Sequence, residues 1–441
     1  MTAKIMMVSL GCAKNLVNSE QMLWLLRQAG FELTTNAEKA EVAVLNTCGF
    51  IDSAVSEAID KILELAQYKK TGSLKKLLVA GCMTQRYKGQ VLDEMPEVDG
   101  LIGCGSYEQI VSAVKSALDG ETPKLFGDID APLTETPRIV STPRYTAYIK
   151  IAEGCDNRCS YCVIPSLRGR YRSRRFEDIV AEAEELAASG VKELIVVAQD
   201  ITRYGTDLYG RRRLAELTRS LCAIDSLKWI RLHYLYPDEL DEELIDTVAS
   251  EPKVVKYLDI PIQHVNNRIL KAMNRRGTKE EITALFYRMR EKIPNLVLRT
   301  SLICGLPGEG EAEFEELVDF LQKMRLERVG VFPFSPQEGT PAAEMGGRAD
   351  EDTVNRRVSI INDLQSEVMD EYNKSRINSV MTVLCEGVDA ETGLYEGRSW
   401  ADSPEIDGRV LFESEKSLSP GDMPDVLIER QQDGDLIGRA L

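Results

Sequence analysis

The sequence has only two histidines, His233 and His264, and it has no long apolar run. A transmembrane helix needs about 20 consecutive apolar residues, whereas the apolar segment at residues 5–8 ends at Ser9. A signal-peptide pattern is absent as well. We therefore expect a cytoplasmic protein with no membrane association, in which the ten cysteines are reduced thiols or metal ligands and not a disulfide framework.

Basic residues are outnumbered by acidic ones: 54 Lys and Arg stand against 71 Asp and Glu, which gives a formal net charge of −17. Proteins that bind nucleic acid usually present a basic surface, so this charge argues against broad phosphate binding and favours a basic partner. The apolar share of 43% and the charged share of 28% are typical of a soluble globular protein. A chain of 441 residues is long enough for about three domains.

Three cysteines lie within eight residues, and we call Cys155, Cys159 and Cys162 the loop trio. Their spacing allows a tight loop to turn all three sulfurs toward one point. Thiolates favour iron–sulfur clusters, zinc or copper(I) over hard cations. A structural zinc site needs a fourth Cys or His nearby, and both histidines lie far downstream. A 4Fe-4S cluster on three cysteines instead leaves one iron open; structural zinc and three incidental thiols are the alternatives.

The first 120 residues alternate short apolar runs with amphipathic segments. The runs have the continuous apolar character of buried parallel strands, and they span residues 5–8, 42–45, 77–80 and 100–103. Helices are expected between them, at residues 19–29, 53–66, 86–94 and 107–118. This alternation predicts an amino-terminal, doubly wound α/β domain over residues 1–120.

A cysteine follows each of the first three predicted strands, and we call Cys12, Cys48 and Cys82 the sheet trio. In open α/β sheets, ligands collect beyond the carboxyl ends of the strands, so these distant cysteines can meet there. Each has an adjacent glycine that allows close backbone approach: Gly11, Gly49 and Gly81. One such cysteine alone is often a small buried hydrophobic residue, but together they predict a second three-thiol site. Cys104 also ends a predicted strand and could close that site.

The rest of the chain is predicted to hold a linker and two further domains. Residues 121–143 are rich in Pro, Asp and Thr, which indicates an extended linker. Residues 144–374 contain six βα units, typical of a partial (βα)6 TIM-type barrel whose chemistry lies at the carboxyl ends of the strands. Its strands are expected at residues 147–152, 194–198, 229–232, 257–260, 297–303 and 329–332. After a helical stretch at 350–377, residues 375–441 have the short strands of a small antiparallel β-barrel.

Polar residues after the barrel strands are candidate site residues, among them Gln199. Five arginines between residues 168 and 175 could bind a cofactor carboxylate or an acidic acceptor through paired hydrogen bonds, or form a solvated charged run. His233 and Cys222 are expected to be structural residues.

The loop trio, with an aromatic residue just before its last cysteine, resembles the signature of the radical S-adenosylmethionine (SAM) enzymes. The resemblance implies that the open iron of a 4Fe-4S cluster binds SAM, whose cleavage yields a 5'-deoxyadenosyl radical, while the protein positions the cofactor. Gln199, at a strand end, is a further candidate for cofactor binding. The turn at Gly305 and Pro307 resembles the segment that packs against the adenosine, although such turns ordinarily mark a loop. Tyr161 is a candidate wall for the adenine, with ordinary packing as the alternative.

Longer segments resemble one branch of that superfamily, the methylthiotransferases. They are residues 148–169, 9–15, 46–48 and 80–82. This resemblance implies that the sheet trio holds an auxiliary 4Fe-4S cluster whose free iron carries the sulfur destined for the product. The family pattern gives Cys104 no ligand role. Residues 375–441 resemble the TRAM domain, a substrate-binding module.

Two features favour the RimO branch, which modifies an aspartate of the small-subunit ribosomal protein S-twelve, over the transfer-RNA branch. Residues 9–15 and 229–237 resemble the RimO pattern. Residues 376–441 carry 6 Lys and Arg against 14 Asp and Glu, whereas an RNA-binding module should be basic. The implied reaction is methylthiolation of the aspartate β-carbon with two SAM molecules by a monomer, with that protein or the small ribosomal subunit, an electron donor and a sulfur donor as partners. A tRNA methylthiotransferase acting on a modified adenosine, a one-cluster radical enzyme and a zinc scaffold are the alternatives.

Overall fold

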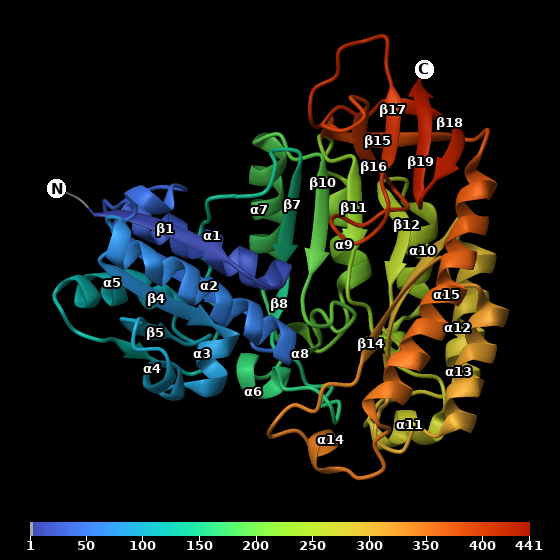
Figure 1. Cartoon of the computed structure of the whole chain (residues 1–441). Coiled ribbons are helices and arrows are strands. Elements are labelled where there is room, and N and C mark those ends of the chain that lie inside the picture. The colour runs from blue at the N-terminus through green and yellow to red at the C-terminus, as the bar shows by residue number, and fades with distance from the viewer. Residues whose placement is uncertain (1–2) are drawn as a thin grey trace.

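The amino-terminal sheet has six parallel strands in the order β2-β1-β3-β4-β5-β6 in the computed structural model, which describes residues 3–441 (Figure 1). These strands are β1 (Lys4–Ser9), β2 (Glu32–Leu33), β3 (Val42–Thr47), β4 (Lys76–Gly81), β5 (Gly100–Ile102) and β6 (Lys124–Leu125). Successive residues of a strand point to opposite faces, so Leu77 and Leu78 enter different apolar cores. The sheet continues through β6 into the segment predicted as a linker.

Helices cover both faces of this sheet, so the predicted doubly wound arrangement is confirmed. One face packs against α1 (Ala13–Gln28) and α5 (Ile110–Leu118). The other packs against α2 (Asp52–Thr71), α3 (Cys82–Tyr87) and α4 (Gln90–Glu94). The strand order reverses between β1 and β3, and such a reversal opens a ligand-binding crevice at the carboxyl ends of the strands. Short 3-10 turns complete the domain at η1 (Ala37–Lys39) and η2 (Tyr107–Gln109).

The central domain contains the predicted partial barrel, an open sheet of six parallel strands in the order β14-β13-β12-β11-β10-β7. Its strands are β7 (Thr146–Lys150), β10 (Glu193–Val197), β11 (Trp229–Leu232), β12 (Val254–Asp259), β13 (Val297–Cys304) and β14 (Arg328–Pro333). The outer layer contains α7 (Phe176–Ala188), α9 (Leu214–Cys222), α10 (Glu242–Ser250), α12 (Lys279–Lys292), α13 (Glu311–Met324) and α15 (Glu351–Arg376). One large apolar core joins these helices to the sheet.

Short elements follow the carboxyl ends of the core strands. A two-stranded antiparallel ribbon, β8 (Ala152–Glu153) with β9 (Arg172–Ser173), flanks the segment that holds the loop trio. The short helices are α6 (Ile164–Arg168), α8 (Thr206–Tyr209), α11 (Asn267–Ala272) and α14 (Pro341–Glu344), with a 3-10 turn at η3 (Pro237–Glu239). None of the helices within residues 3–441 is long and apolar enough to span a membrane.

The carboxy-terminal domain is a small closed β-barrel, as predicted, and its five strands follow the order β15-β16-β17-β19-β18. The strands are β15 (Val380–Val388), β16 (Tyr395–Ser399), β17 (Val410–Glu413), β18 (Asp425–Gln432) and β19 (Asp435–Ala440). Neighbouring strands are antiparallel, except that β17 and β19 pair in parallel.

Buried ion pairs fix this small barrel to the amino ends of the core strands. Glu193, the first residue of β10, pairs with Arg231 of β11 at 2.9 Å and with Arg398 of β16 at 2.7 Å. The loop between β16 and β17 adds Asp402, which pairs with Arg328 at 2.9 Å. Figure 1 shows the small barrel over this end of the strands, with α6 near the opposite end. His233, predicted to be structural, is buried with Nε2 3.3 Å from Ser403 Oγ of the same loop.

Glu193→Gln should lower the free energy of unfolding by about 3–5 kcal/mol, because it leaves the buried guanidinium of Arg231 without a counter-charge. Arg398 would keep only its ion pair with Glu386. Burial opposes ionisation of Glu193, but Arg398 and Arg231 lower its pKa to about 2. The wild-type protein should therefore hold this stabilisation above about pH 4.3 and lose it as the pH falls toward 2. Denaturant titrations of both proteins at several pH values measure this difference.

The matched control is Glu243→Gln, which removes an exposed ion pair with Arg219. Exposed pairs contribute little, so this variant should unfold like the wild-type protein. Equal losses in the two variants would contradict the structural role of Glu193.

Candidate iron–sulfur site

The loop trio lies directly after β7 and β8, at the carboxyl ends of the core strands. The loop begins at Gly154, whose φ is +81°, and a Cβ there would lie 2.0 Å from the carbonyl oxygen of Arg170. Only glycine fits such a position. Burial raises the pKa of Cys155 to about 11, and burial followed by the charge of Cys159 raises the pKa of Cys162. The three sulfurs are thus close enough to influence one another.

The sheet trio gathers at the crevice beside the strand reversal. Cys12 caps α1 after β1, Cys48 follows β3, and Cys82 opens α3 after β4. The backbone beside Cys12 comes so close to Cys48 that a Cβ at Gly11, where φ is +87°, would lie 2.8 Å from Cys48 Cβ. Burial raises the pKa of Cys48 to about 11, and the neighbouring thiolates of Cys82 and Cys12 add to this rise. The structure therefore brings all three cysteines together.

The two trios lie on either side of one seam between the amino-terminal domain and the core barrel. Val163, the residue after Cys162, packs with Leu167 against Cys82 in one buried apolar cluster. Arg168, only 2% exposed, ends α6, the helix that follows Val163. Its Nε lies 3.3 Å from Cys82 Sγ and its Nη1 lies 3.4 Å from Glu153. The segment that follows one trio thus contacts the other directly.

Cys82 has an environment that favours its thiolate form. A hydrogen bond donated by Cys104, with Sγ atoms 4.0 Å apart, and the charge and hydrogen bond of Arg168 together lower the pKa of Cys82 to about 6 against the effect of burial. Tyr107 in turn donates to Cys104 Sγ at 3.6 Å. Cys104, considered from sequence as a fourth ligand, is placed here as a hydrogen-bond donor to Cys82. The thiolate is the form that binds metal.

The donor chemistry of both trios fits iron–sulfur clusters, because the thiolate is a soft ligand. Within the described part of the chain, no three His, Cys, Asp or Glu side chains are close enough to hold a single metal ion. Gln199, at the end of β10, donates to Glu153 at 2.8 Å, while its buried Oε1 has no partner among residues 3–441. That oxygen can accept a hydrogen bond from a bound cofactor.

The other predicted cofactor residues lie together at the opposite side of the loop trio. Tyr161 packs in one apolar cluster with Leu306, which stands between Gly305 and Pro307, and its hydroxyl accepts a hydrogen bond from Arg275 at 3.1 Å. A Cβ at Gly305 would lie 2.5 Å from Val354 Cγ2 in α15. Packing of α15 therefore explains this glycine, and cofactor contact of Tyr161, Gly305 and Pro307 stays a prediction.

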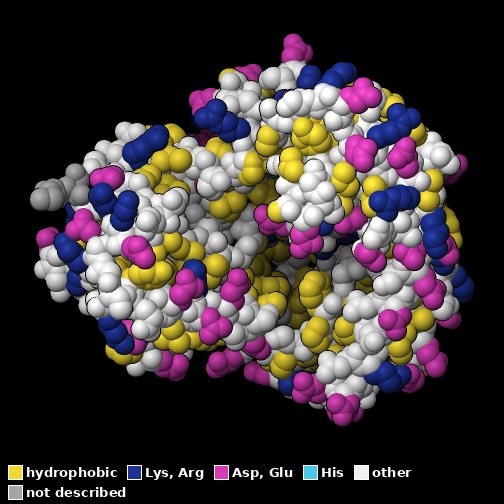
Figure 2. All heavy atoms as spheres, turned by 45° about the horizontal axis from the view of Figure 1, so that its top comes forward, with side chains coloured by type: hydrophobic (Ala, Val, Ile, Leu, Met, Phe, Trp, Pro, Cys, Tyr) yellow, Lys and Arg dark blue, Asp and Glu magenta, His cyan; other side chains and the backbone are white. Residues whose placement is uncertain are grey.

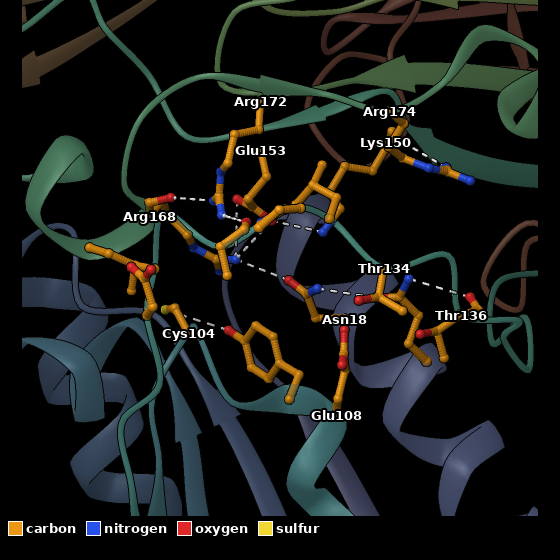
Figure 3. Close-up of a pocket in the computed structure, with 18 of the residues that line it drawn as sticks. Asn18, Cys104, Glu108, Thr134, Thr136, Lys150, Glu153, Arg168, Arg172 and Arg174 are labelled. Atoms are coloured by element: carbon orange, nitrogen blue, oxygen red, sulfur yellow. Dashed lines mark hydrogen bonds and ion pairs between the residues drawn. The ribbon is translucent and has the colours of Figure 1, made fainter. Parts of the chain in front are cut away.

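Three of the five arginines in the predicted block bind the protein itself, whereas Arg170 and Arg175 are exposed. Arg172 donates to the carbonyl of Ala131 at 2.6 Å, and Arg174 pairs with Glu182 at 2.6 Å. Figure 3 shows Arg168 between Glu153 and Asn18, at a cavity of about 190 Å³ that Cys104 also lines. Sequence reasoning missed Arg138, which pairs with Glu20 and Glu182 across the seam, because its partners are distant in the chain.

An open parallel barrel with a three-cysteine loop at its carboxyl edge defines a radical SAM protein. The profile of the Radical SAM superfamily matches residues 149–321, that of Uncharacterized protein family UPF0004 matches 4–103, and that of the TRAM domain matches 377–441. The radical SAM methyltransferase TsrM from Kitasatospora setae has a similar fold, with a TM-score of 0.60 and 14% identity over 84% of this chain and 90% of that chain. The cobalamin-dependent SAM radical enzyme OxsB has a TM-score of 0.51 and 14% identity, over 83% of this chain and 56% of that chain.

Full-length relatives are more similar. A protein from Pelotomaculum thermopropionicum, named ribosomal protein uS12 methylthiotransferase RimO, is 49% identical over 446 residues that span 100% of both chains. A protein of the same name from Acetivibrio thermocellus is 46% identical over 449 residues, covering 100% of this chain and 99% of that one. The chain therefore belongs to the RimO family of radical SAM methylthiotransferases. Membership in the radical SAM superfamily implies a 4Fe-4S cluster and SAM.

Proposed function

We propose that this protein methylthiolates the β-carbon of an aspartate in ribosomal protein uS12, with two SAM molecules as cosubstrates. The observation that carries this proposal is the placement of two cysteine trios across one seam, with Val163 and Arg168 of one side against Cys82 of the other. We further propose that each trio holds a 4Fe-4S cluster. The full-length relatives with the uS12 name support the choice of acceptor.

The acceptor carbon explains why radical chemistry is needed. The β-carbon of an aspartate is neither nucleophilic nor appreciably acidic, so a general base has little to act on. When bound, the clusters and SAM supply hydrogen abstraction, sulfur and a methyl group. The chain itself would hold each cluster through three thiolates, and it packs Val163 and Leu167 against Cys82. Gln199 Oε1, which has no partner within residues 3–441, would accept a hydrogen bond from SAM.

Charge supports a basic protein as the partner. The TRAM domain has a net charge of −8 over residues 376–441, and its exposed carboxylates include Glu391, Glu413, Glu415 and Asp433. Figure 2 shows a hollow between the amino-terminal lobe and the rest of the molecule, with acidic side chains on its rim. Complementary charge provides specificity and a fast association rate. We propose that the protein acts as a monomer in the cytoplasm, on uS12 or the small ribosomal subunit, with separate electron and sulfur donors.

The test uses anaerobically reconstituted full-length protein with SAM, a reductant, a sulfide source and purified uS12. Tandem mass spectrometry should find one added methylthio group on a single aspartate of uS12. The same mixture with bulk tRNA is the matched comparison. Modification of an adenosine in tRNA, with unchanged uS12 and RNA binding that weakens steeply with salt, would favour the transfer-RNA alternative.

A further inference from the structure

Lys14 is a buried lysine that forms no ion pair with a carboxylate among the described residues. It lies in the first turn of α1, is 8% exposed, and its ammonium makes no hydrogen bond or ion pair with any residue from 3 to 441. Lysines are almost never buried this deeply unless they are paired. The helix dipole also disfavours a cation in the first turn. The fold therefore keeps a positive charge where its own groups do not neutralise it.

The surroundings of Lys14 offer only weak compensation. Its Nζ lies 3.7 Å from the centroid of the Tyr234 ring, a cation–π contact that cannot replace a counter-charge. The carboxylates nearby have closer cationic partners. Glu153 pairs with Lys150 at 2.7 Å, and Asp259 pairs with Arg299 at 2.8 Å. The thiolate of Cys12 is the other anionic group beside Lys14, and the proposed function assigns it to the cluster. A further anion at Lys14 would come from a bound molecule.

The position of Lys14 indicates which molecule that is. It stands two residues after Cys12 of the sheet trio, and Tyr234 follows β11 at the carboxyl edge of the barrel. Asp259 ends β12 at the same edge. Lys14 thus points from the sheet trio toward the end of the barrel where radical SAM chemistry takes place. An acceptor held between the two trios would lie beside it.

We propose that Lys14 binds the side-chain carboxylate of the acceptor aspartate and so selects an acidic residue of a protein substrate. This inference rests on the proposed function. The carboxylate is bonded to the reacting β-carbon, so a single ammonium contact positions that carbon closely. A neutral asparagine would leave the lysine unpaired, and sites built for one polar group reject analogues that lack it.

The experiment is a double-mutant cycle on the reconstituted holoenzyme. Binding of purified uS12 and of uS12 with the modified aspartate changed to asparagine is measured for wild type, Lys14→Gln and Lys14→Arg. Removing one partner of a buried charge pair costs at least about 25-fold in affinity. We expect Lys14→Gln to bind uS12 at least about 25-fold more weakly than the wild type does. The variant should bind the asparagine form as the wild type does, and it should keep its iron content and SAM cleavage. Lys14→Arg should retain most of the affinity.

Lys61→Gln is the matched control, because Lys61 lies on the exposed side of α2 in the same domain and pairs with Glu64; it should bind uS12 normally. Equal weakening of both uS12 forms, or a loss of iron in Lys14→Gln, would overturn the inference and assign Lys14 to cluster binding. Unimpaired modification by Lys14→Gln would overturn it as well. No modification of uS12 by the wild-type enzyme would instead overturn the proposed function.

Discussion

Cys155→Ala is expected to abolish both SAM cleavage and methylthiolation. With one thiolate gone, two cysteines remain in the loop between β8 and α6, too few to hold a 4Fe-4S cluster with a single open iron. The iron content should fall from about eight to about four atoms per chain, since the sheet trio lies on a different domain. Anaerobic iron analysis, release of 5'-deoxyadenosine and the mass of uS12 measure the three effects.

Cys222→Ala is the control for this experiment. Cys222 is buried in α9 on the outer side of the barrel, so its loss should cost some stability but leave iron content and both reactions intact. Cleavage of SAM by Cys155→Ala at the wild-type rate would refute the assignment of the loop trio. Loss of all iron in that variant would mean that the two sites cannot load independently.

Much of the scaffold could be predicted from the sequence because buried parallel strands are continuous apolar runs. Residues 77–80 are an example, and all of them are buried in β4. The meeting of the three sheet-trio cysteines could be predicted from the topology, since the carboxyl ends of neighbouring parallel strands lie at one edge. β6 was not predicted, because its two residues, Lys124 and Leu125, are too few to form a pattern.

Long-range polar contacts could not be predicted. Arg168 lies in a charged run that is ordinarily solvated, yet its partners Cys82 and Asn15 are 86 and 153 residues away. The acidic loop between β16 and β17 likewise has the composition of an exposed turn, but Asp402 and Asp407 contact Arg328 and Tyr257 of the barrel. Such pairs depend on how whole domains dock, which local periodicity does not encode. The contacts of Arg168 also join the two domains that carry the trios.

Cys48→Ala is expected to separate the two reactions: SAM cleavage should continue while sulfur insertion into uS12 stops. Cys48 follows β3 in the amino-terminal sheet, and the loop trio is held by β7, β8 and α6 of the other domain, so its own three thiolates stay in place. Iron should again fall to about four atoms per chain. Deoxyadenosine should still form, and the uS12 mass should stay unchanged.

The seam makes this a demanding test, because Val163 and Leu167 pack against Cys82 and could transmit damage from one site to the other. Cys48→Ser is the companion variant, since it keeps the volume of the side chain but is a poor soft ligand. If both variants keep SAM cleavage, the loop trio works without the second cluster and the sheet trio is needed only for sulfur. Loss of cleavage in the serine variant too would show that the sites do not divide the labour, and the proposed roles of the two trios would have to be abandoned.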